Sequence, residues 1–217
     1  VASTRLGFSP SRTMQVAQKL YEAGHITYMR TDSTNLSAVA VGQILALVQK
    51  KYGMEYAEAH TYKTKSKNAQ EAHEAIRPTH IDVLSVGSTD EQKKLYKLIW
   101  ERAISSQMTD AKLMKTKISA LPTKTSLSNW KHKNEYPAFS TNGSRMLFPG
   151  WLLVDSDARG EDVELPEINE GDVLKVLELG SLEKETQPPF RYSEAGLVKE
   201  LEARGIGRPS TYASIMR

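Results

Sequence analysis

Apolar residues recur at every third or fourth position in the N-terminal half of the chain, which is the spacing of amphipathic helices. One such stretch follows Ser9 and Ser11, either of which can cap a helix, and it stops at Gly24. A second stretch follows Ser37 and stops at Gly53. The apolar stripes consist of Met14, Ala17, Leu20 and Tyr21 in the first stretch, and of Val41, Ile44, Leu45 and Val48 in the second. The pattern therefore predicts two helices.

Three further segments complete this helical region. Residues 26–30 are predicted to be extended, and residues 54–70, which are polar and rich in lysine, to form a loop. Ser88 and Glu91 have the spacing of a capping box at the start of a third helix. The apolar face of that helix consists of Leu95, Leu98, Ile99, Trp100 and Ile104. Residues 1–114 thus form a predicted helical unit of turn-linked helices, which is typical of helix-turn-helix architecture.

The spacing of apolar residues shortens toward two after Lys115, which indicates β-strands. Clusters of Gly, Pro, Asn and Asp separate the apolar runs, as in antiparallel sheets. The predicted strands are 116–121, 147–154 and 172–179. This β segment is expected to end near Pro188-Pro189.

A helical pattern returns in the last part of the chain. Ser193 can cap a helix over 194–204, a glycine-rich turn follows, and Ser210 can cap another helix. The predicted fold class is therefore α+β. Its expected domains are a helical unit (1–114), a β-rich segment (115–190) and the start of a second helical domain (191–217).

Composition and charge narrow the function classes. The 217 residues contain no cysteine, which excludes disulfides and thiol catalysis and fits a reducing compartment. No apolar run approaches the ~20 residues of a membrane helix, so we expect a cytoplasmic protein that does not contact a membrane. The net charge is +3, and the basic excess lies before residue 115, which permits nucleic-acid contact there.

The richest chemistry lies in residues 18–33, the tyrosine signature, which reads Gln-Lys-Leu-Tyr-Glu-Ala-Gly-His-Ile-Thr-Tyr-Met-Arg-Thr-Asp-Ser. Tyr28 stands between hydroxyl groups, and Arg30 follows two residues later. A phenol can attack phosphorus, and a guanidinium can hold phosphate oxygens and favour the phenolate. Most tyrosines in such an extended segment pack in a core, but the polar neighbours here favour a reactive site.

Two more motifs suit phosphate binding, each with an ordinary structural alternative. In the segment 70–78, His73 and Arg77 would lie together on a helix, although Pro78 limits that helix. The alternative is a surface turn with ordinary ion pairs, and the metal-binding His spacing is absent. Near the C-terminus, Arg208 and Thr211 stand beside a predicted helix start, where an anion can bind. A glycine-capped turn with incidental charges explains that segment equally well.

In this order, the motifs resemble successive blocks of the type IA DNA topoisomerases, and of bacterial DNA topoisomerase I within them. The resembling blocks are residues 8–14, the tyrosine signature, 71–78 and 193–214. The resemblance implies that Tyr28 is the nucleophile, which links to the 5′-phosphate of a cut strand. It implies that Arg30 contacts the scissile phosphate and that His73 supports a phosphate near the break. The positions that it assigns to DNA binding are Gln18, Glu22, Thr27, Thr31, Asp32, Arg208 and Thr211.

The resemblance also implies what surrounds this site. The first domain would be a lid with a CAP-like helix-turn-helix, the second part of a β arch, and the third the start of another CAP-like domain. The intact protein would be a monomeric, ATP-independent isomerase that acts on single-stranded or negatively supercoiled DNA in the cytoplasm. Its Mg²⁺ would be bound by a Toprim domain, for which this sequence has no match. We expect no metal in this chain.

The pattern Asp155-x-Asp157 tests that expectation, because it follows an apolar run and resembles the Toprim acidic motif. No amphipathic helix follows it, so a solvated acidic hairpin is the better interpretation. The chain begins at Val1 and ends at Arg217, which indicates a piece of a longer protein that would not cleave DNA alone. The alternative function is a non-catalytic helix-turn-helix module that binds DNA.

Overall fold

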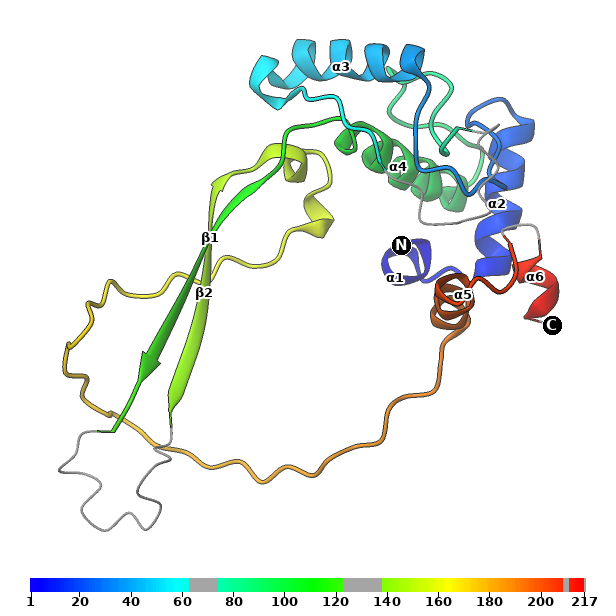
Figure 1. Ribbon diagram of the computed structural model, residues 1–217. Coiled ribbons are helices and arrows are strands. Elements are labelled where there is room, and N and C mark those ends of the chain that lie inside the picture. The colour runs from blue at the N-terminus through cyan, green and yellow to red at the C-terminus, as the bar shows by residue number, and fades with distance from the viewer. Residues whose placement is uncertain (63–73, 123–137, 209–210, 217) are drawn as a thin grey trace. The chain divides into compact units, whose positions relative to one another are not determined.

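The computed structural model describes residues 1–62, 74–122, 138–208 and 211–216. The chain divides into two compact units (Figure 1). The first unit contains residues 1–110, 150–156 and 189–217, and the second contains residues 111–149 and 157–188. Residues 150–156, which the sequence pattern places in the β segment, therefore group with the helices.

Capping side chains begin the helices α2 (Pro10–Glu22), α3 (Ala38–Tyr52) and α4 (Asp90–Ser105) of the first unit. Its other N-terminal elements are α1 (Ala2–Leu6) and the 3-10 turn η1 (Met54–Tyr56). The Ser9 hydroxyl accepts a hydrogen bond from the Arg12 amide at 3.1 Å, and Pro10 occupies the first turn of α2. Ser37 caps α3 in the same way. Both predicted helices are confirmed, with Ser9 selected over Ser11.

The start of α4 differs from the prediction by one residue. Thr89, not Ser88, is the N-cap, and its capping-box partner is Gln92, not Glu91. Gln92 Oε1 also accepts hydrogen bonds from the Ser88 amide and hydroxyl at 2.8 and 2.9 Å. Gly87 has φ +111°, and a Cβ built there would lie 2.6 Å from Gln92 Cβ. The turn at Gly87 places Ser88 just before the N-cap Thr89, so Ser88 does not cap the helix.

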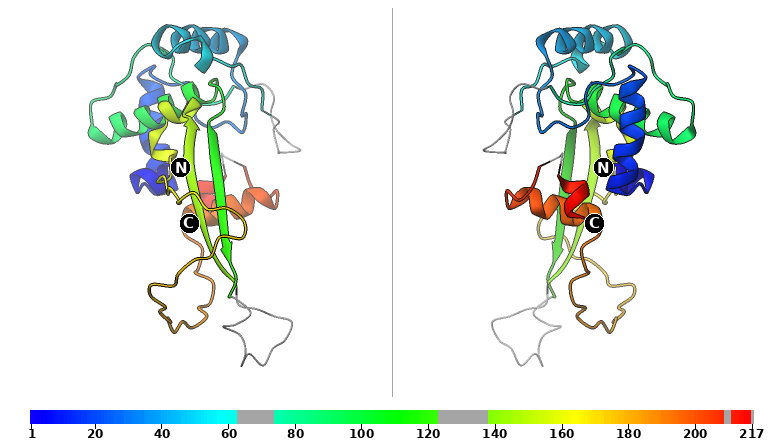
Figure 2. Two further views of the ribbon diagram at one scale, coloured as in Figure 1. Left: turned by 90° about the vertical axis from the view of Figure 1, so that its left-hand side faces the viewer. Right: turned by 90° about the vertical axis from the view of Figure 1, so that its right-hand side faces the viewer.

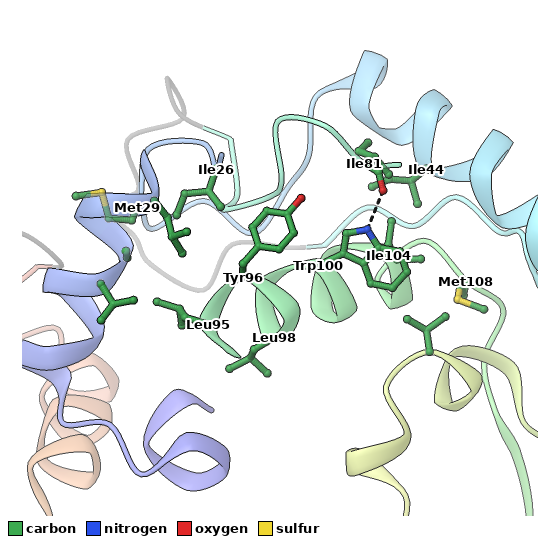
Figure 3. Close-up of a cluster of buried hydrophobic side chains, with 14 of the residues drawn as sticks. Ile26, Met29, Ile44, Ile81, Leu95, Tyr96, Leu98, Trp100, Ile104 and Met108 are labelled. Atoms are coloured by element: carbon green, nitrogen blue, oxygen red, sulfur yellow. Dashed lines mark hydrogen bonds between the residues drawn. The ribbon is translucent and has the colours of Figure 1, made fainter. Parts of the chain in front are cut away.

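The core of the first unit lies where α2 and α4 pack together. Its fully buried side chains include Leu20, Ile44, Tyr96, Ile104 and Met108. The Trp100 indole N–H donates a 2.7 Å hydrogen bond to the Ile81 carbonyl (Figure 3). This bond attaches the loop before α4 to the helix itself.

The second unit is built on two antiparallel strands, β1 (Lys112–Ala120) and β2 (Phe139–Phe148), which run side by side in both views of Figure 2. Gly143 on β2 is buried, and Leu165 lies so close that a Cβ at position 143 would be 2.6 Å from it. Ser144 exchanges backbone hydrogen bonds of 2.9 and 3.0 Å with Val163, so a third segment lies along β2.

The strand predictions are confirmed in part. The strand expected at 116–121 lies within β1 as far as Ala120. The strand expected at 147–154 is wrong, because β2 ends at Phe148 and a 3-10 turn, η3 (Gly150–Leu153), follows. Proline cannot donate a ladder hydrogen bond, and Gly150 has a positive φ of 48°, so Pro149-Gly150 ends the strand.

The strand expected at 172–179 is also wrong. The chain has no regular secondary structure there, and it pairs with no strand among the described residues. Val173 and Leu177 are 86% and 90% exposed. An alternating apolar pattern needs a partner surface to become a strand, and nothing in the described parts of the chain covers this segment.

The C-terminal part contains α5 (Glu194–Ala203), α6 (Tyr212–Ile215) and, between η3 and these helices, the short turn η4 (Ser156–Ala158). Ser193 caps α5 as predicted, with its hydroxyl accepting from the Gly196 amide at 3.1 Å. The expected cap Ser210 lies outside the described residues. The fold is thus a mixture of helices and a small antiparallel sheet. No helix in the described ranges is long and apolar enough to cross a membrane.

Candidate functional site around Tyr28

Tyr28 lies on an irregular turn directly after α2. Gly24, with φ +73°, reverses the chain, and the His25 amide returns a hydrogen bond of 2.9 Å to the Leu20 carbonyl. Ile26 and Met29 are buried in the core, where Figure 3 shows their side chains, and they fix the turn on both sides. Tyr28 is 37% exposed. The turn therefore presents this tyrosine to solvent from a firmly held backbone.

The expected extended segment 26–30 forms only in part. Ile26 makes an isolated antiparallel bridge with Pro78, and a bend follows at Met29 and Arg30. Met29 is buried between Tyr28 and Arg30, but these three residues do not form a regular strand. The side chains of Tyr28 and Arg30 are both exposed. Arg30 makes no hydrogen bond or ion pair with any residue that the structure describes.

Residues 75–79 clamp the tyrosine turn from 50 positions away in sequence. The Thr27 amide donates to the Arg77 carbonyl at 2.9 Å, and the Thr79 amide donates to the His25 carbonyl at 3.0 Å. The Thr27 hydroxyl accepts from the Arg77 amide at 3.0 Å and donates to the Ala75 carbonyl at 3.2 Å. The second motif of the sequence is therefore brought against the first. His73 itself lies outside the described residues.

Glu74 and Arg77 support this clamp with a two-pronged ion pair. The Arg77 Nε and Nη2 atoms lie 3.1 and 2.9 Å from the two Glu74 carboxylate oxygens. Glu74 also accepts a 3.1 Å hydrogen bond from the Ser37 amide at the start of α3. Partial burial acts to raise the pKa of Glu74, but the hydrogen bonds from Arg77 and Ser37 outweigh it and lower that pKa. The carboxylate thus joins the clamp to α3.

Two predicted residues, Gln18 and Glu22, lie in the last part of α2. Gln18 donates a 2.7 Å hydrogen bond to Glu22, one helical turn later, so each orients the other. Tyr21, which the sequence pattern places on the apolar stripe of this helix, is 40% exposed and packs edge to face on Tyr28, with ring centroids 5.3 Å apart and planes at 67°. The helix end therefore supplies both polar and aromatic neighbours to the turn.

The residues after Arg30 turn inward. The Thr31 hydroxyl accepts from the Ser33 amide at 3.1 Å, which orders the loop. Asp32 is half-buried and lines a cavity of about 650 Å³ together with Tyr62 and Trp151. Asp32 is therefore less exposed than Tyr28 and Arg30.

Two residues that sequence reasoning missed hold these loops together. The Asn35 amide group exchanges 2.8 Å hydrogen bonds with the backbone of Tyr62, and the Asn35 carbonyl accepts from the Ala75 amide at 2.7 Å. The Thr79 hydroxyl donates to the Gly24 carbonyl at 2.6 Å. An Asn before a helix cap and a Thr after a proline are weak signals, since their partners are far away in sequence.

Arg208 and Thr211 are hydrogen-bonded to each other before α6. The Arg208 amide donates to the Thr211 hydroxyl, and the Thr211 amide donates to the Arg208 carbonyl, both at 2.8 Å. Both residues are exposed. The pKa of the neighbouring Tyr212 is raised by burial and then by the charges of Glu202 and Asp32. Asp32 is therefore the part of the tyrosine signature whose charge acts on this segment.

The acidic pattern at Asp155 is not a solvated hairpin, and that interpretation is wrong. Asp155 is fully buried, and its carboxylate contacts Arg5 at 2.5 Å and Arg102 at 3.3 Å. The reason is that Arg5 and Arg102 stand more than 50 residues away in sequence, so their pairing is invisible to a local pattern.

A metal does not fit this position. Both carboxylate oxygens of Asp155 already serve guanidinium groups, and Asp157 is exposed. Within the part of the chain that the structure describes, no three of the His, Asp and Glu side chains lie close enough to hold an ion. The described residues therefore offer no donor set for the Mg²⁺ that the resemblance implies for the intact protein.

Comparisons with known proteins agree over the full length of the chain. The family model for DNA topoisomerase matches residues 1–217. DNA topoisomerase 1 of Pseudomonas aeruginosa is 44% identical and that of Vibrio cholerae 46% identical, each over 99% of this chain. The chain spans 24% of the length of each of these relatives.

A solved structure of a DNA topoisomerase is also similar to this chain. Full-length topoisomerase I from Thermotoga maritima matches with a TM-score of 0.76 and 36% identity, over 98% of this chain and 34% of that one. These matches do not favour the alternative of a non-catalytic DNA-binding module. The chain carrying Tyr28 and its clamp thus belongs to the DNA topoisomerase family, within the bacterial type IA enzymes.

Proposed function

We propose that this chain is the tyrosine-bearing part of a type IA DNA topoisomerase and that Tyr28 is its nucleophile. The observation that carries the proposal is the tyrosine turn itself. An exposed phenol and an exposed guanidinium stand two residues apart on a backbone fixed by Ile26, Met29 and the clamp from residues 75–79. Such preorganisation is what an attacking group needs, because the geometry is settled before the substrate arrives.

The reaction would exchange one phosphodiester for another. The Tyr28 oxygen forms a bond to phosphorus while the bond from phosphorus to the 3′ oxygen breaks. The phenol loses its proton, and the leaving oxygen gains one to become a 3′-hydroxyl. Since one ester replaces another, the reverse step can reseal the strand without ATP. Between the two steps a second strand passes through the break, which relaxes negative supercoils.

The other predicted residues take supporting roles in this proposal. Arg30 would neutralise the scissile phosphate, for which its exposed guanidinium is suited. The exposed Glu22, with its partner Gln18, would line the path of a single strand, as would Thr27, Thr31 and Asp32. Arg208 and Thr211 would contact a phosphate further along. His73, which lies outside the described residues, would support a phosphate near the break.

In this proposal, another domain of the intact protein binds the metal ion. When present, Mg²⁺ would stabilise the charge on the transferred phosphate, held by a Toprim domain of the intact protein. The described residues of this chain supply no ligands for it, so their part is limited to attack, phosphate binding and orientation. We further propose that the intact protein is a monomer. We also propose that it acts in the cytoplasm, since its relatives are bacterial and DNA is the proposed substrate.

The proposal is tested with the intact protein and a radiolabelled single-stranded oligonucleotide. Wild-type protein with Mg²⁺ should give a covalent adduct that survives denaturation, and Tyr28→Phe should give none. Tyr192→Phe changes another exposed tyrosine of the chain and serves as the matched control, which should form adduct normally. An adduct that persists in Tyr28→Phe would show that another residue is the nucleophile.

A further inference from the structure

The fixed backbone of the tyrosine turn does not by itself determine the orientation of the Tyr28 ring. Ile26 and Met29 fix the backbone of the turn, but Tyr28 lies outside every helix and strand and is 37% exposed. A tyrosine side chain on such a turn can occupy several staggered rotamers. Only a rotamer that directs the phenol oxygen at phosphorus is productive, so something must favour it.

Tyr21 is placed to do this. It lies in the last turn of α2, directly after the fully buried Leu20, so its Cα is fixed by the core. The Gly24 amide donates to the Tyr21 carbonyl at 2.8 Å, which closes the helix end over it. The rings of Tyr21 and Tyr28 meet edge to face at 5.3 Å and 67°, the favoured arrangement for aromatic pairs.

We propose that Tyr21 is a positioning residue that holds the Tyr28 ring in its attacking rotamer through this edge-to-face contact. The inference rests on the proposed function, because it assigns Tyr21 a task in that same reaction. The contact needs an aromatic ring at position 21 and does not need its hydroxyl. Tyr21 is itself 40% exposed, so its ring is not required to fill the core.

A competing role for Tyr21 gives different results. An exposed aromatic beside a strand-cleaving site can also stack on a nucleobase, which would contribute to DNA affinity. A positioning residue instead changes the rate of adduct formation at saturating DNA and leaves the Kd for DNA unchanged. Measuring both the rate of adduct formation and the Kd for DNA therefore distinguishes the two roles.

The experiment uses the intact protein, with single-turnover adduct formation and DNA affinity measured separately. Tyr21→Ala should slow adduct formation at saturating DNA about tenfold, because the loss of the ring contact spreads Tyr28 over unproductive rotamers. Tyr21→Phe should restore the wild-type rate. Met54→Ala truncates another exposed apolar side chain of the same unit and is the matched control. A thermal melt of each variant separates these effects from unfolding.

A second readout does not depend on activity. In protein labelled with ¹³C in the tyrosine rings, the Tyr28 signal is assigned by its absence in Tyr28→Phe. Tyr21→Ala should shift this signal, because the ring current of Tyr21 is lost, whereas Met54→Ala should not. If Tyr21→Ala weakens DNA binding and leaves the rate unchanged, Tyr21 is a base contact and the inference is overturned.

The same set of variants distinguishes this inference from the proposed function. If Tyr28→Phe still forms adduct, the assignment of the nucleophile fails, whatever position 21 does. If Tyr28→Phe is inactive and Tyr21→Ala cleaves at the wild-type rate with an unshifted Tyr28 signal, only the positioning role fails.

Discussion

At the scale of single residues, the site depends on side chains that satisfy backbone groups far away in sequence. Thr27 is an example, since its one hydroxyl contacts the backbone of both Ala75 and Arg77. Local sequence identified Thr27 only as a polar neighbour of the tyrosine. Its structural task could not be predicted, because hydrogen-bond partners at a separation of 50 residues leave no periodic pattern.

Glu74 makes the stability of the site dependent on pH. Its pKa is lowered in the folded chain, so its ion pair with Arg77 stabilises the fold above the unfolded pKa. That contribution should disappear as the pH falls through the lowered pKa of the folded state. The difference in unfolding free energy between wild type and Glu74→Gln should therefore be constant near neutral pH and shrink below about pH 4.5.

Urea unfolding of the 217-residue chain at a series of pH values measures this difference. Glu55→Gln is the control, because Glu55 is an exposed carboxylate of the same unit that makes no ion pair with any described residue. A difference for Glu74→Gln that grows as the pH falls would contradict the assignment.

Asp155 offers a second prediction at the scale of the residue. Asp155→Asn should destabilise the chain by about 3–5 kcal/mol, because it leaves the guanidinium groups of Arg5 and Arg102 without their buried counter-charge. Asp157→Asn, two residues away and exposed, should change the stability by less than about 0.5 kcal/mol. Thermal unfolding gives both values. Equal effects at the two positions would mean that the buried cluster does not form.

At the scale of elements, helix starts were predictable where the cap lies within three residues of its partner. Ser9, Ser37 and Ser193 each accept from an amide three positions later, so local chemistry decides these starts. The strands were harder to predict. The run after β2 has a strand-like composition, but Pro149 and Gly150 redirect the chain, and the segment 172–179 has no partner among the described residues.

The cap of α4 tests the corrected helix start. Thr89→Ala should destabilise the chain by about 1 kcal/mol, because it removes the acceptor for the Gln92 amide. Ser88→Ala should cost less, since the Gln92 side chain still receives the Ser88 and Thr89 amides. Chemical denaturation of the two variants ranks them. The opposite ranking would restore the helix start that the sequence pattern suggested.

At the scale of the whole molecule, the family was predictable from the order of short motifs, because those motifs carry the chemistry. The mixed α+β fold was predictable from the spacing of apolar residues, which shortens after residue 115. The arrangement of chain segments was not. Residues 150–156 group with the helices through Asp155 and through the hydrogen bond from the Trp151 amide to the Thr109 carbonyl. A pattern of strand-forming residues contains no information about such long-range anchoring.

The chain by itself should bind DNA but not cut it. We expect the purified 217-residue chain to bind single-stranded DNA weakly, with an affinity that falls as salt rises, because exposed cations such as Arg30 would contact phosphates. It should form no covalent adduct with Mg²⁺, since its described residues offer no site for that ion. Fluorescence anisotropy and a denaturing gel measure the two properties. Robust Mg²⁺-dependent cleavage by the purified chain would contradict the proposal that the metal is bound by another domain.

The clamp on Thr27 also has a consequence for how the chain is made. Closing a loop of 50 residues costs entropy that is recovered only when both ends are present. During synthesis, Tyr28 emerges well before Ala75, Arg77 and Thr79, so the nascent chain carries a tyrosine whose surroundings are not yet formed. The reactive geometry appears only after those residues have left the ribosome and folded back. The order of synthesis thus delays the final surroundings of Tyr28, the proposed nucleophile, until the residues that support its turn have been made.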